Sequence, residues 1–500
     1  MCGVVAIFDP TNRLGDAERD ATGQRMLDRV RHRGPDGIGH RQVGVTWLGH
    51  TRLAIVDLAE GDQPIGSGEG HWLVANGEIY NHEDIRAETS YPFVTDSDSE
   101  VALAAVLSDN PAALGDLRGM FAFIVADEDG GAVVVRDPVG VKPLYWAQVD
   151  GVVYFASEVG AFDAGIRERI REFPPGCRWD QTGTLTRFRD LHVPADLIAS
   201  RDDAITLIRE TTIDCVRRRM MADVPVGVFL SGGLDSSLVA AIMAGSAPPR
   251  TIHSFAAGTA SSSDLAAARA VAEHVGTIHH ELVYTADDVV RALPAVVGCI
   301  ESYEPSLVRS AVPNYLLSQM TAQTVKVVLT GEGADELFAG YDHFREITDP
   351  EALRDALVEG IFGLHNLNLQ RADRVTMAHG LEARVPFLDR DLVNLAARIA
   401  IEWKLPGEHG QEKALLREAF DGWLPHELLW RPKEQFGDGS GTADVMREKA
   451  LSLVPDSGWR DERVAGLPQP RSREELAYQR MFADHLAGVS PDLLGRFATA

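Results

Sequence analysis

The chain has 500 residues, 45% hydrophobic and 24% charged, a composition typical of a soluble globular protein with two or more domains. The formal net charge of −26 argues against a nucleic-acid partner, which requires clustered Lys and Arg, and no apolar run is long enough to span a membrane. Four scattered cysteines without metal-binding spacing, and no secretory signal, favour a reducing cytoplasm.

The first part of the chain, residues 1–195, is rich in predicted strands. Short apolar runs bounded by turn residues occur at 4–8, 72–75, 120–125 and 132–135. Helical patterns occur near 16–31 and 98–108. This mixture predicts an α+β or sandwich-like domain, in which helices cover sheets.

After residue 200, helical segments alternate with isolated strands at 226–230, 251–255 and 326–329. Strands separated by helices predict βαβ units and a parallel sheet. The boundary is expected near 190–203, which divides the chain into domains 1–195 and 200–500. Residues 442–500 contain no motif.

The second residue is Cys2. Removal of the initiator methionine would place its thiol beside a free α-amine, whose pKa of about 8 suits it to accept the thiol proton near neutral pH. On its own this string favours a chance cysteine at position two.

Four further strings make a chance cysteine less plausible. They are a charged turn at 31–36, an Arg beside a strand at 51–57, a predicted turn at 76–81 after the strand 72–75, and a helix cap at 96–100. An Asn amide and a Gly N–H can form an oxyanion hole, Arg can pair with an α-carboxylate, and Asp with an α-ammonium. Asn-Gly alone usually marks a plain turn.

Together these strings resemble the class II glutamine amidotransferases, which hydrolyse glutamine to glutamate and ammonia. The resemblance implies an Ntn-type αββα sandwich with Cys2 as nucleophile and its own amine as base. It implies Asn76 and Gly77 as the oxyanion hole, and the glutamine-binding residues Arg52, Asn76, Glu78 and Asp98.

Residues 231–237, SGGLDSS, follow a strand and open a helix near 236–244. Backbone N–H groups and the helix dipole favour phosphate there, and no Gly-Lys-Ser/Thr follows as in a Walker A loop. The string resembles the loop of ATP pyrophosphatases, which form AMP. That resemblance implies ATP as substrate and the binding residues Leu230, Ser231, Gly232, Gly233, Asp235, Ser236, Ala257, Thr330 and Gly331. The string 253–258 is expected after a strand and could contact adenine.

A second glycine-rich turn at 330–336 carries carboxylates suited to hold Mg²⁺ against phosphates, and Asp235 with Asp335 is the expected metal pair. The alternative for Asp335 is a solvated helix N-terminus. Lys433 is expected to neutralise charge on the leaving pyrophosphate.

Together with the front domain, these strings resemble the glutamine-hydrolysing asparagine synthetases over nearly the whole chain. The resemblance implies a homodimer in which glutamine yields ammonia and ATP adenylates a carboxylate, expected to be that of aspartate. Ammonia then travels through a tunnel to displace AMP. Glu332 would accept a proton from ammonia, whereas related β-lactam synthetases have tyrosine there and lack the N-terminal Cys. Arg309, Glu336 and Glu382 are acceptor-binding or structural candidates.

The segment 301–309 departs from the pattern of the asparagine synthetases, in a region that the resemblance places near the acceptor carboxylate. The acceptor could therefore be another small carboxylic acid of a natural-product pathway. A second alternative is an inactive regulatory homologue, which the intact Cys2, SGGLDSS and Glu332 disfavour. The acidic charge disfavours a third, a pyrophosphatase acting on tRNA, and the type of front domain does not fit one acting on GMP precursors.

Overall fold

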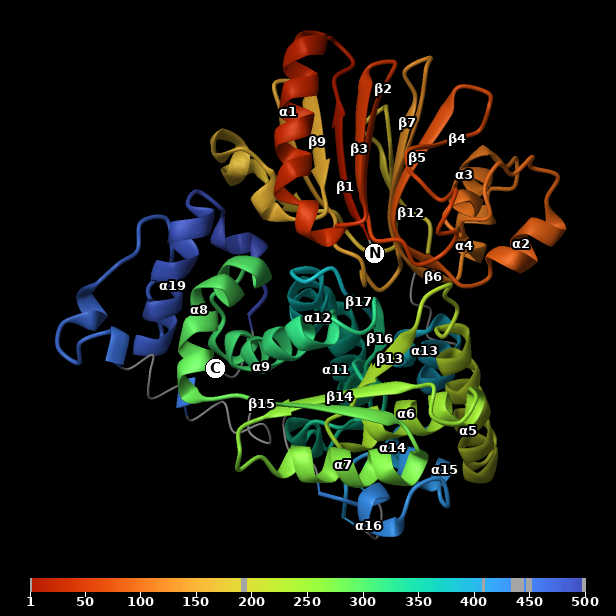
Figure 1. Cartoon of the computed structure of the whole chain (residues 1–500), viewed down its shortest axis with the longest axis vertical. Coiled ribbons are helices and arrows are strands. Elements are labelled where there is room, and N and C mark those ends of the chain that lie inside the picture. The colour runs from red at the N-terminus through yellow and green to blue at the C-terminus, as the bar shows by residue number, and fades with distance from the viewer. Residues whose placement is uncertain (1, 190–195, 407–409, 433–444, 447–451, 497–500) are drawn as a thin grey trace.

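The structure is a computed structural model, which describes residues 2–189, 196–406, 410–432, 445–446 and 452–496. The chain forms two domains, one above the other in Figure 1, and its N-terminal end lies where they meet. The front domain ends with strand β12 (Leu185–Arg187), and the back domain begins with helix α5 (Arg201–Arg218).

The front domain contains two six-stranded antiparallel sheets. The first has the order β10 (Arg171–Glu172), β8 (Tyr145–Val149), β9 (Val152–Ala156), β1 (Gly3–Phe8), β3 (Thr46–Arg52) and β2 (Gly37–Val43). Helix α1 (Gly15–Arg29) covers its outer face. Every residue of β1 is buried, because Val5 and Ile7 pack under α1 while Val4 and Ala6 face the second sheet.

The second sheet has the order β12, β11 (Cys177–Asp180), β7 (Ala132–Arg136), β6 (Gly119–Asp127), β5 (His71–Ile79) and β4 (Ile65–Gly66). An apolar cluster joins β5 and β6 to α3 (Glu100–Leu107) on its outer face, beside α2 (His82–Glu88) and α4 (Ala113–Asp116). The two sheets and their covering helices confirm the predicted αββα sandwich.

The predicted turn at Asn76–Gly77 is wrong, because β5 continues through both residues. Gly77 pairs with Phe121 of β6 at a φ of +144°, and a Cβ there would lie 1.9 Å from the Met120 carbonyl oxygen. Glycine thus serves a close approach of two strands rather than a reversal of the chain. The predicted helix cap at 96–100 is also wrong in detail, because Ser99 precedes α3 without a capping side-chain bond.

The back domain is built on a parallel five-stranded sheet, as predicted. Its order is β15 (Ile278–Val283), β14 (His253–Gly258), β13 (Val226–Phe229), β16 (Val327–Leu329) and β17 (Glu382–Arg384). The string 253–258, expected to follow a strand, is the strand β14 itself, because it pairs with β15 along its whole length.

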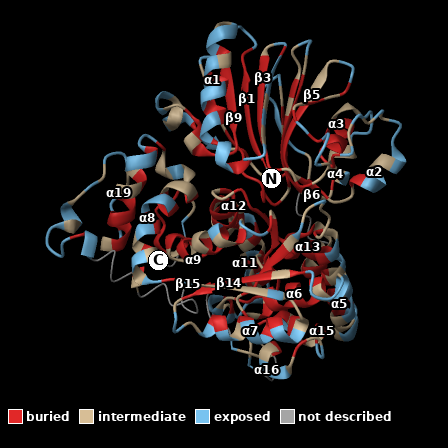
Figure 2. Cartoon of the chain, in the orientation of Figure 1, coloured by how far each residue is buried: buried red, intermediate tan, exposed pale blue. Residues whose placement is uncertain are grey.

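Helices cover both faces of this sheet, so its central strands β13 and β16 are largely buried (Figure 2). Val228 packs with α5, α6 (Leu234–Ser246) and α7 (Ser263–Val275), whereas Phe229 packs with α8 (Ala286–Ile300) and α9 (Pro305–Thr321). The remaining helices are α10 (Ala334–Leu337), α11 (Pro350–Gly363), α12 (Asn368–Met377), α13 (Arg390–Ala397), α14 (Ile401–Lys404), α15 (Ala414–Ala419), α16 (His426–Leu429) and α19 (Arg473–Leu486).

Short 3₁₀ helices complete the described chain: η1 (Arg31–Arg33), η2 (Val159–Ala161), η3 (Ala164–Arg169), η4 (Asp342–Glu346), η5 (Leu364–Asn366), η6 (Pro386–Leu388), η7 (Trp459–Asp461) and η8 (Pro491–Leu493). Within the described residues, no helix is both long and apolar enough to cross a membrane.

Candidate functional site

Cys2 lies just before β1, at the end of the sandwich that faces the back domain. It is 8% exposed, and burial raises the pKa of its thiol. Its peptide nitrogen donates to Asn76 Oδ1 at 3.0 Å, and its carbonyl accepts from Arg33 Nε at 3.1 Å. Residues far apart in the sequence therefore fix the backbone that carries the thiol.

Asn76 is completely buried on β5. Its Oδ1 is engaged by Cys2, but its Nδ2 has no hydrogen-bond partner among the described residues. A buried amide N–H without a partner is costly, so its retention suggests that it donates to a ligand. The predicted oxyanion donors, Asn76 and Gly77, thus lie in the same strand next to Cys2.

Arg52, the last residue of β3, points its guanidinium at Asp62 and at backbone carbonyls. Its Nη1 contacts Asp62 Oδ1 at 2.8 Å, and its Nη2 bonds the carbonyl of Asp57. The Asp62 side chain is 82% exposed, so a ligand carboxylate could replace it at low cost. Asp98 Oδ2 accepts from the Ile79 nitrogen at 2.7 Å, and burial raises the Asp98 pKa to about 6.

Glu78, predicted to bind glutamine, lies against the back domain. Its Oε2 lies 3.2 Å from Arg384 Nη2 on β17. Burial, together with the nearby charges of Glu382 and Asp98, raises the pKa of Glu78 well above its usual value. Glu382, an acceptor candidate, belongs to the same contact, since its Oε1 bonds Arg384 Nε at 2.5 Å.

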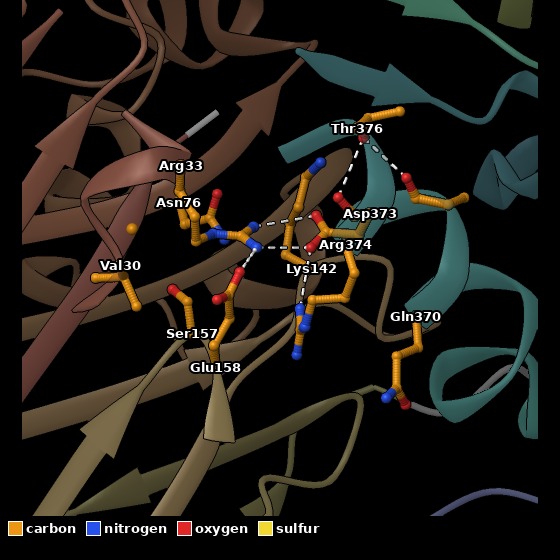
Figure 3. Close-up of polar contacts among 12 residues, drawn as sticks. Val30, Arg33, Asn76, Lys142, Ser157, Glu158, Gln370, Asp373, Arg374 and Thr376 are labelled. Carbon is orange, nitrogen blue, oxygen red and sulfur yellow. Dashed lines mark hydrogen bonds and ion pairs between the residues drawn. The ribbon is translucent and has the colours of Figure 1, made fainter. Parts of the chain in front are cut away.

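A buried cluster of charges joins the two domains (Figure 3), and its Arg33 also bonds the Cys2 carbonyl. Arg33 makes a bidentate pair with Asp373 of α12, at 2.9 and 3.1 Å, and contacts Glu158 at 2.6 Å. Arg374 Nη1 bonds Asp373 at 3.0 Å, and its Nη2 contacts Glu301 at 3.2 Å. Sequence reasoning missed this cluster, because no local pattern shows which charges meet across a domain interface.

Residues 231–237 join β13 to α6, as predicted, and residues 234–237 form the first turn of α6. Ser231 Oγ and Ser236 Oγ lie 3.1 Å apart, and the Ser236 hydroxyl lies 3.2 Å from both the Ser231 nitrogen and the Gly233 carbonyl oxygen. Gly232 has a φ of +74°, and a Cβ there would lie 2.5 Å from the Ala267 side chain. Only glycine therefore allows this tight turn against α7.

A cavity of about 880 Å³ opens above this loop. Most of the predicted nucleotide residues line it: Leu230, Ser231, Gly233, Asp235, Ser236, Ala257, Thr330 and Gly331, but not Gly232. The cavity also contains Glu332, Asp335, Glu336 and Arg309, whereas Glu382 is not part of its lining. One chamber thus holds the loop, the carboxylates and an arginine.

The two predicted metal ligands meet at one ammonium group. Lys413 Nζ contacts Asp235 Oδ2 at 2.5 Å and Asp335 Oδ1 at 2.7 Å. Two carboxylates beside a phosphate-binding loop suit Mg²⁺, whose remaining ligands are usually phosphate and water oxygens. Within the described ranges, no group of three or more His, Cys, Asp or Glu could hold a metal ion, so nucleotide oxygens would have to complete the shell.

Lys413 was missed by the sequence reasoning, because it stands 178 residues from Asp235 and belongs to no recognised string. Lys433, the lysine predicted for this role, lies outside the described residues. Arg431, close by in sequence, lines the cavity and lies 3.3 Å from the Gly232 carbonyl oxygen.

Glu332 forms an ion pair with Arg371 of α12 on the cavity wall. Burial raises the pKa of Glu332 although Arg371 opposes the shift. Glu336 bonds the Tyr341 hydroxyl at 2.7 Å, and burial with the Asp335 charge raises its pKa to about 7. The cavity therefore contains a carboxylate, that of Glu336, able to take up a proton near neutral pH.

The segment 301–309, which the sequence singled out, is fixed from both sides. Glu301 accepts from the Gly160 nitrogen of the front domain at 2.6 Å. Buried Glu304 pairs with Arg471 at 2.6 Å, and Arg309 Nη1 lies 3.6 Å from Glu474 of α19. The C-terminal part of the chain, which has no motif, thus supports the segment that leads into the cavity.

Comparisons with known proteins agree with this division. A family model described as a glutamine amidotransferase domain matches residues 1–173, and one described as asparagine synthase matches 207–359 and 345–490. Asparagine synthetase B (glutamine-hydrolysing) of Escherichia coli is 37% identical over 511 residues, covering 97% of this chain and 91% of that protein. A probable glutamine-hydrolysing asparagine synthetase of Schizosaccharomyces pombe is 39% identical, covering 96% and 93%.

A solved structure described as the allosteric regulatory enzyme of purine biosynthesis covers 56% of this chain and 80% of its own, at 18% identity. Its TM-score of 0.34 is too low to carry an argument.

Proposed function

Because the chain belongs to the glutamine-hydrolysing asparagine synthetase family, we propose that it converts glutamine, aspartate, ATP and water to asparagine, glutamate, AMP and pyrophosphate. The observation that carries the proposal is the pairing of two sites in one chain. A buried thiol lies beside the amide of Asn76, and a separate cavity combines a glycine-rich loop with Glu332.

In the front site, Cys2 is the nucleophile that attacks the side-chain amide carbon of glutamine. Its α-amine, freed by removal of Met1, accepts the thiol proton. Asn76 Nδ2 and the Gly77 nitrogen donate to the oxyanion, and Arg52 pairs with the substrate α-carboxylate. Ammonia leaves with the transferred proton, and water releases glutamate from the thioester.

In the back cavity, the loop 231–237 holds the phosphates of ATP at the N-terminus of α6. Magnesium held by Asp235 and Asp335 would neutralise charge on the phosphate oxygens. The acceptor carboxylate, oriented by Arg309, attacks the α-phosphorus, and pyrophosphate leaves. Ammonia then attacks the acyl-adenylate, AMP leaves, and Glu332 accepts the proton; its raised pKa supports that role.

The acceptor is tested by a screen of small carboxylic acids with glutamine and ATP, in which AMP, pyrophosphate and product mass are measured. A strong preference for aspartate supports the proposal. Turnover of a different acid supports the same chemistry in a natural-product pathway, which the unusual segment 301–309 would explain. Absence of AMP with every acid would support an inactive homologue.

Two variants separate the half-reactions. Cys2→Ala should lose glutamine-dependent amide formation and keep activity with added ammonia. Glu332→Gln should still release glutamate from glutamine but lose at least about 100-fold in amide formation, the scale of one acid–base group. Normal amide yield from Glu332→Gln would overturn its assignment. Light scattering tests the homodimer that we also propose.

A further inference from the structure

The ammonium of Lys413 occupies the point where the two proposed metal ligands converge. Its Nζ lies 2.5 Å from Asp235 Oδ2 and 2.7 Å from Asp335 Oδ1, and its side chain is only 2% exposed. Lys413 is therefore a charged group enclosed by its counter-ions.

Two backbone features are needed to place Lys413 here. Its φ is +55°, a left-handed conformation that is unfavourable for a residue with a side chain. Gly340 lies against it, and a Cβ at that position would be 2.3 Å from Lys413 Cε and 2.0 Å from Asp335 Oδ1. Strained backbone and a required glycine indicate a built arrangement rather than an incidental surface ion pair.

The same carboxylate oxygens cannot fully serve an ammonium and a metal ion at once. Mg²⁺ binds carboxylate oxygens at about 2.0–2.1 Å, and its two charges would repel an ammonium held at the same point. Lys413 also lines the cavity above residues 231–237, so its ammonium can move to another position within that cavity. A lysine stem is long and flexible enough for such a movement.

We propose that Lys413 is a resident counter-cation, which holds Asp235 and Asp335 together until a metal–nucleotide complex arrives and then moves its ammonium to a phosphate oxygen. This inference rests on the proposed nucleotide site. Metal and nucleotide must then bind together, because a metal ion alone has to displace the lysine without phosphate to receive it. Throughout the exchange a cation stays beside the two carboxylates.

The test uses Mn²⁺ as the metal probe with the full-length protein, in the absence of nucleotide. Electron paramagnetic resonance counts free Mn²⁺, and calorimetry gives the dissociation constant. Lys413→Met should bind Mn²⁺ at least tenfold tighter than the wild type, and Mn²⁺ should raise its melting temperature more than that of the wild type. Lys413→Gln, whose amide can still bond the carboxylates, is the second variant if Lys413→Met does not fold.

The control is Lys326→Met, which makes the same substitution at a 37% exposed lysine that pairs with Asp36. It should leave Mn²⁺ affinity unchanged. Equal Mn²⁺ affinity of wild type and Lys413 variants, with intact binding of Mn²⁺–ATP, would overturn the counter-cation role and leave the nucleotide site standing. Failure of the wild type to bind Mn²⁺–ATP would overturn both.

Discussion

Replacing Arg33 by methionine should destabilise the contact between the two domains. The Arg33 side chain is fully buried and serves Asp373, Glu158 and the Cys2 carbonyl. Methionine fills much of the volume but leaves the carboxylates of Asp373 and Glu158 with fewer partners. Removing one member of a buried ion pair typically costs about 3–5 kcal/mol, and we expect a loss in that range.

The loss is best measured locally, since unfolding of a two-domain chain need not be two-state. Hydrogen exchange at the Val159 and Gly160 amides, which bond Glu301 across the interface, reports opening of the contact. A double-mutant cycle of Arg33→Met with Asp373→Asn should give an interaction free energy of roughly 0.5–3 kcal/mol between the two side chains. We expect a value toward the upper end, because the pair is bidentate and buried.

The pair Arg13–Asp150 provides the matched control. Its two atoms lie 3.1 Å apart, but the side chains are 57% and 63% exposed. The same substitutions, Arg13→Met and Asp150→Asn, should give a coupling below about 1 kcal/mol. If the buried and exposed cycles gave equal couplings, the reasoning from burial would be refuted.

Two further changes test the front domain. Gly77→Ala should lower the free energy of unfolding by more than about 2 kcal/mol and abolish glutamate release, because its Cβ would meet the Met120 carbonyl at a positive φ. The control Gly165→Ala, whose Cβ would meet nothing within 4 Å, should be harmless. Equal melting temperatures of the two variants would contradict this expectation. Burial raises the Glu172 pKa, but Arg136 and the hydrogen-bonded His365 together outweigh burial and lower the pKa to about 2 from 4.5. Its carboxylate therefore adds stability above pH 4.5 that is lost as the pH falls toward 2, and Glu172→Gln should flatten that acid decline in melting temperature; an unchanged decline would contradict the assignment.

The sequence could predict those parts of the fold and site in which local pattern and local structure agree. The apolar run before 231–237 and the glycines within it predict a strand, a tight turn and a helix, and β13, the loop and α6 follow that order. Asn76–Gly77 was misread because the same dipeptide suits both a turn and a close strand pair. Only the partner strand, with Met120 against Gly77, decides between them.

Contacts between distant charges could not be predicted in this way. Lys413 and Asp235 are 178 residues apart, and Arg33 and Asp373 are 340 apart. A lysine or arginine in a sequence is equally consistent with a solvated side chain and with a buried partner. Which of these occurs depends on how the two domains and their loops pack, information that no short pattern contains.

The support of the segment 301–309 by α19 has an evolutionary consequence. Arg309 faces the cavity, and Glu474 lies behind it on a helix that carries no recognisable motif. If Arg309 orients the acceptor as proposed, mutations in this part of the chain would alter the preference for an acceptor while every diagnostic string stays intact. Related chains with identical motifs can diverge in substrate through inherited changes at position 474, and positions 309 and 474 are expected to change together.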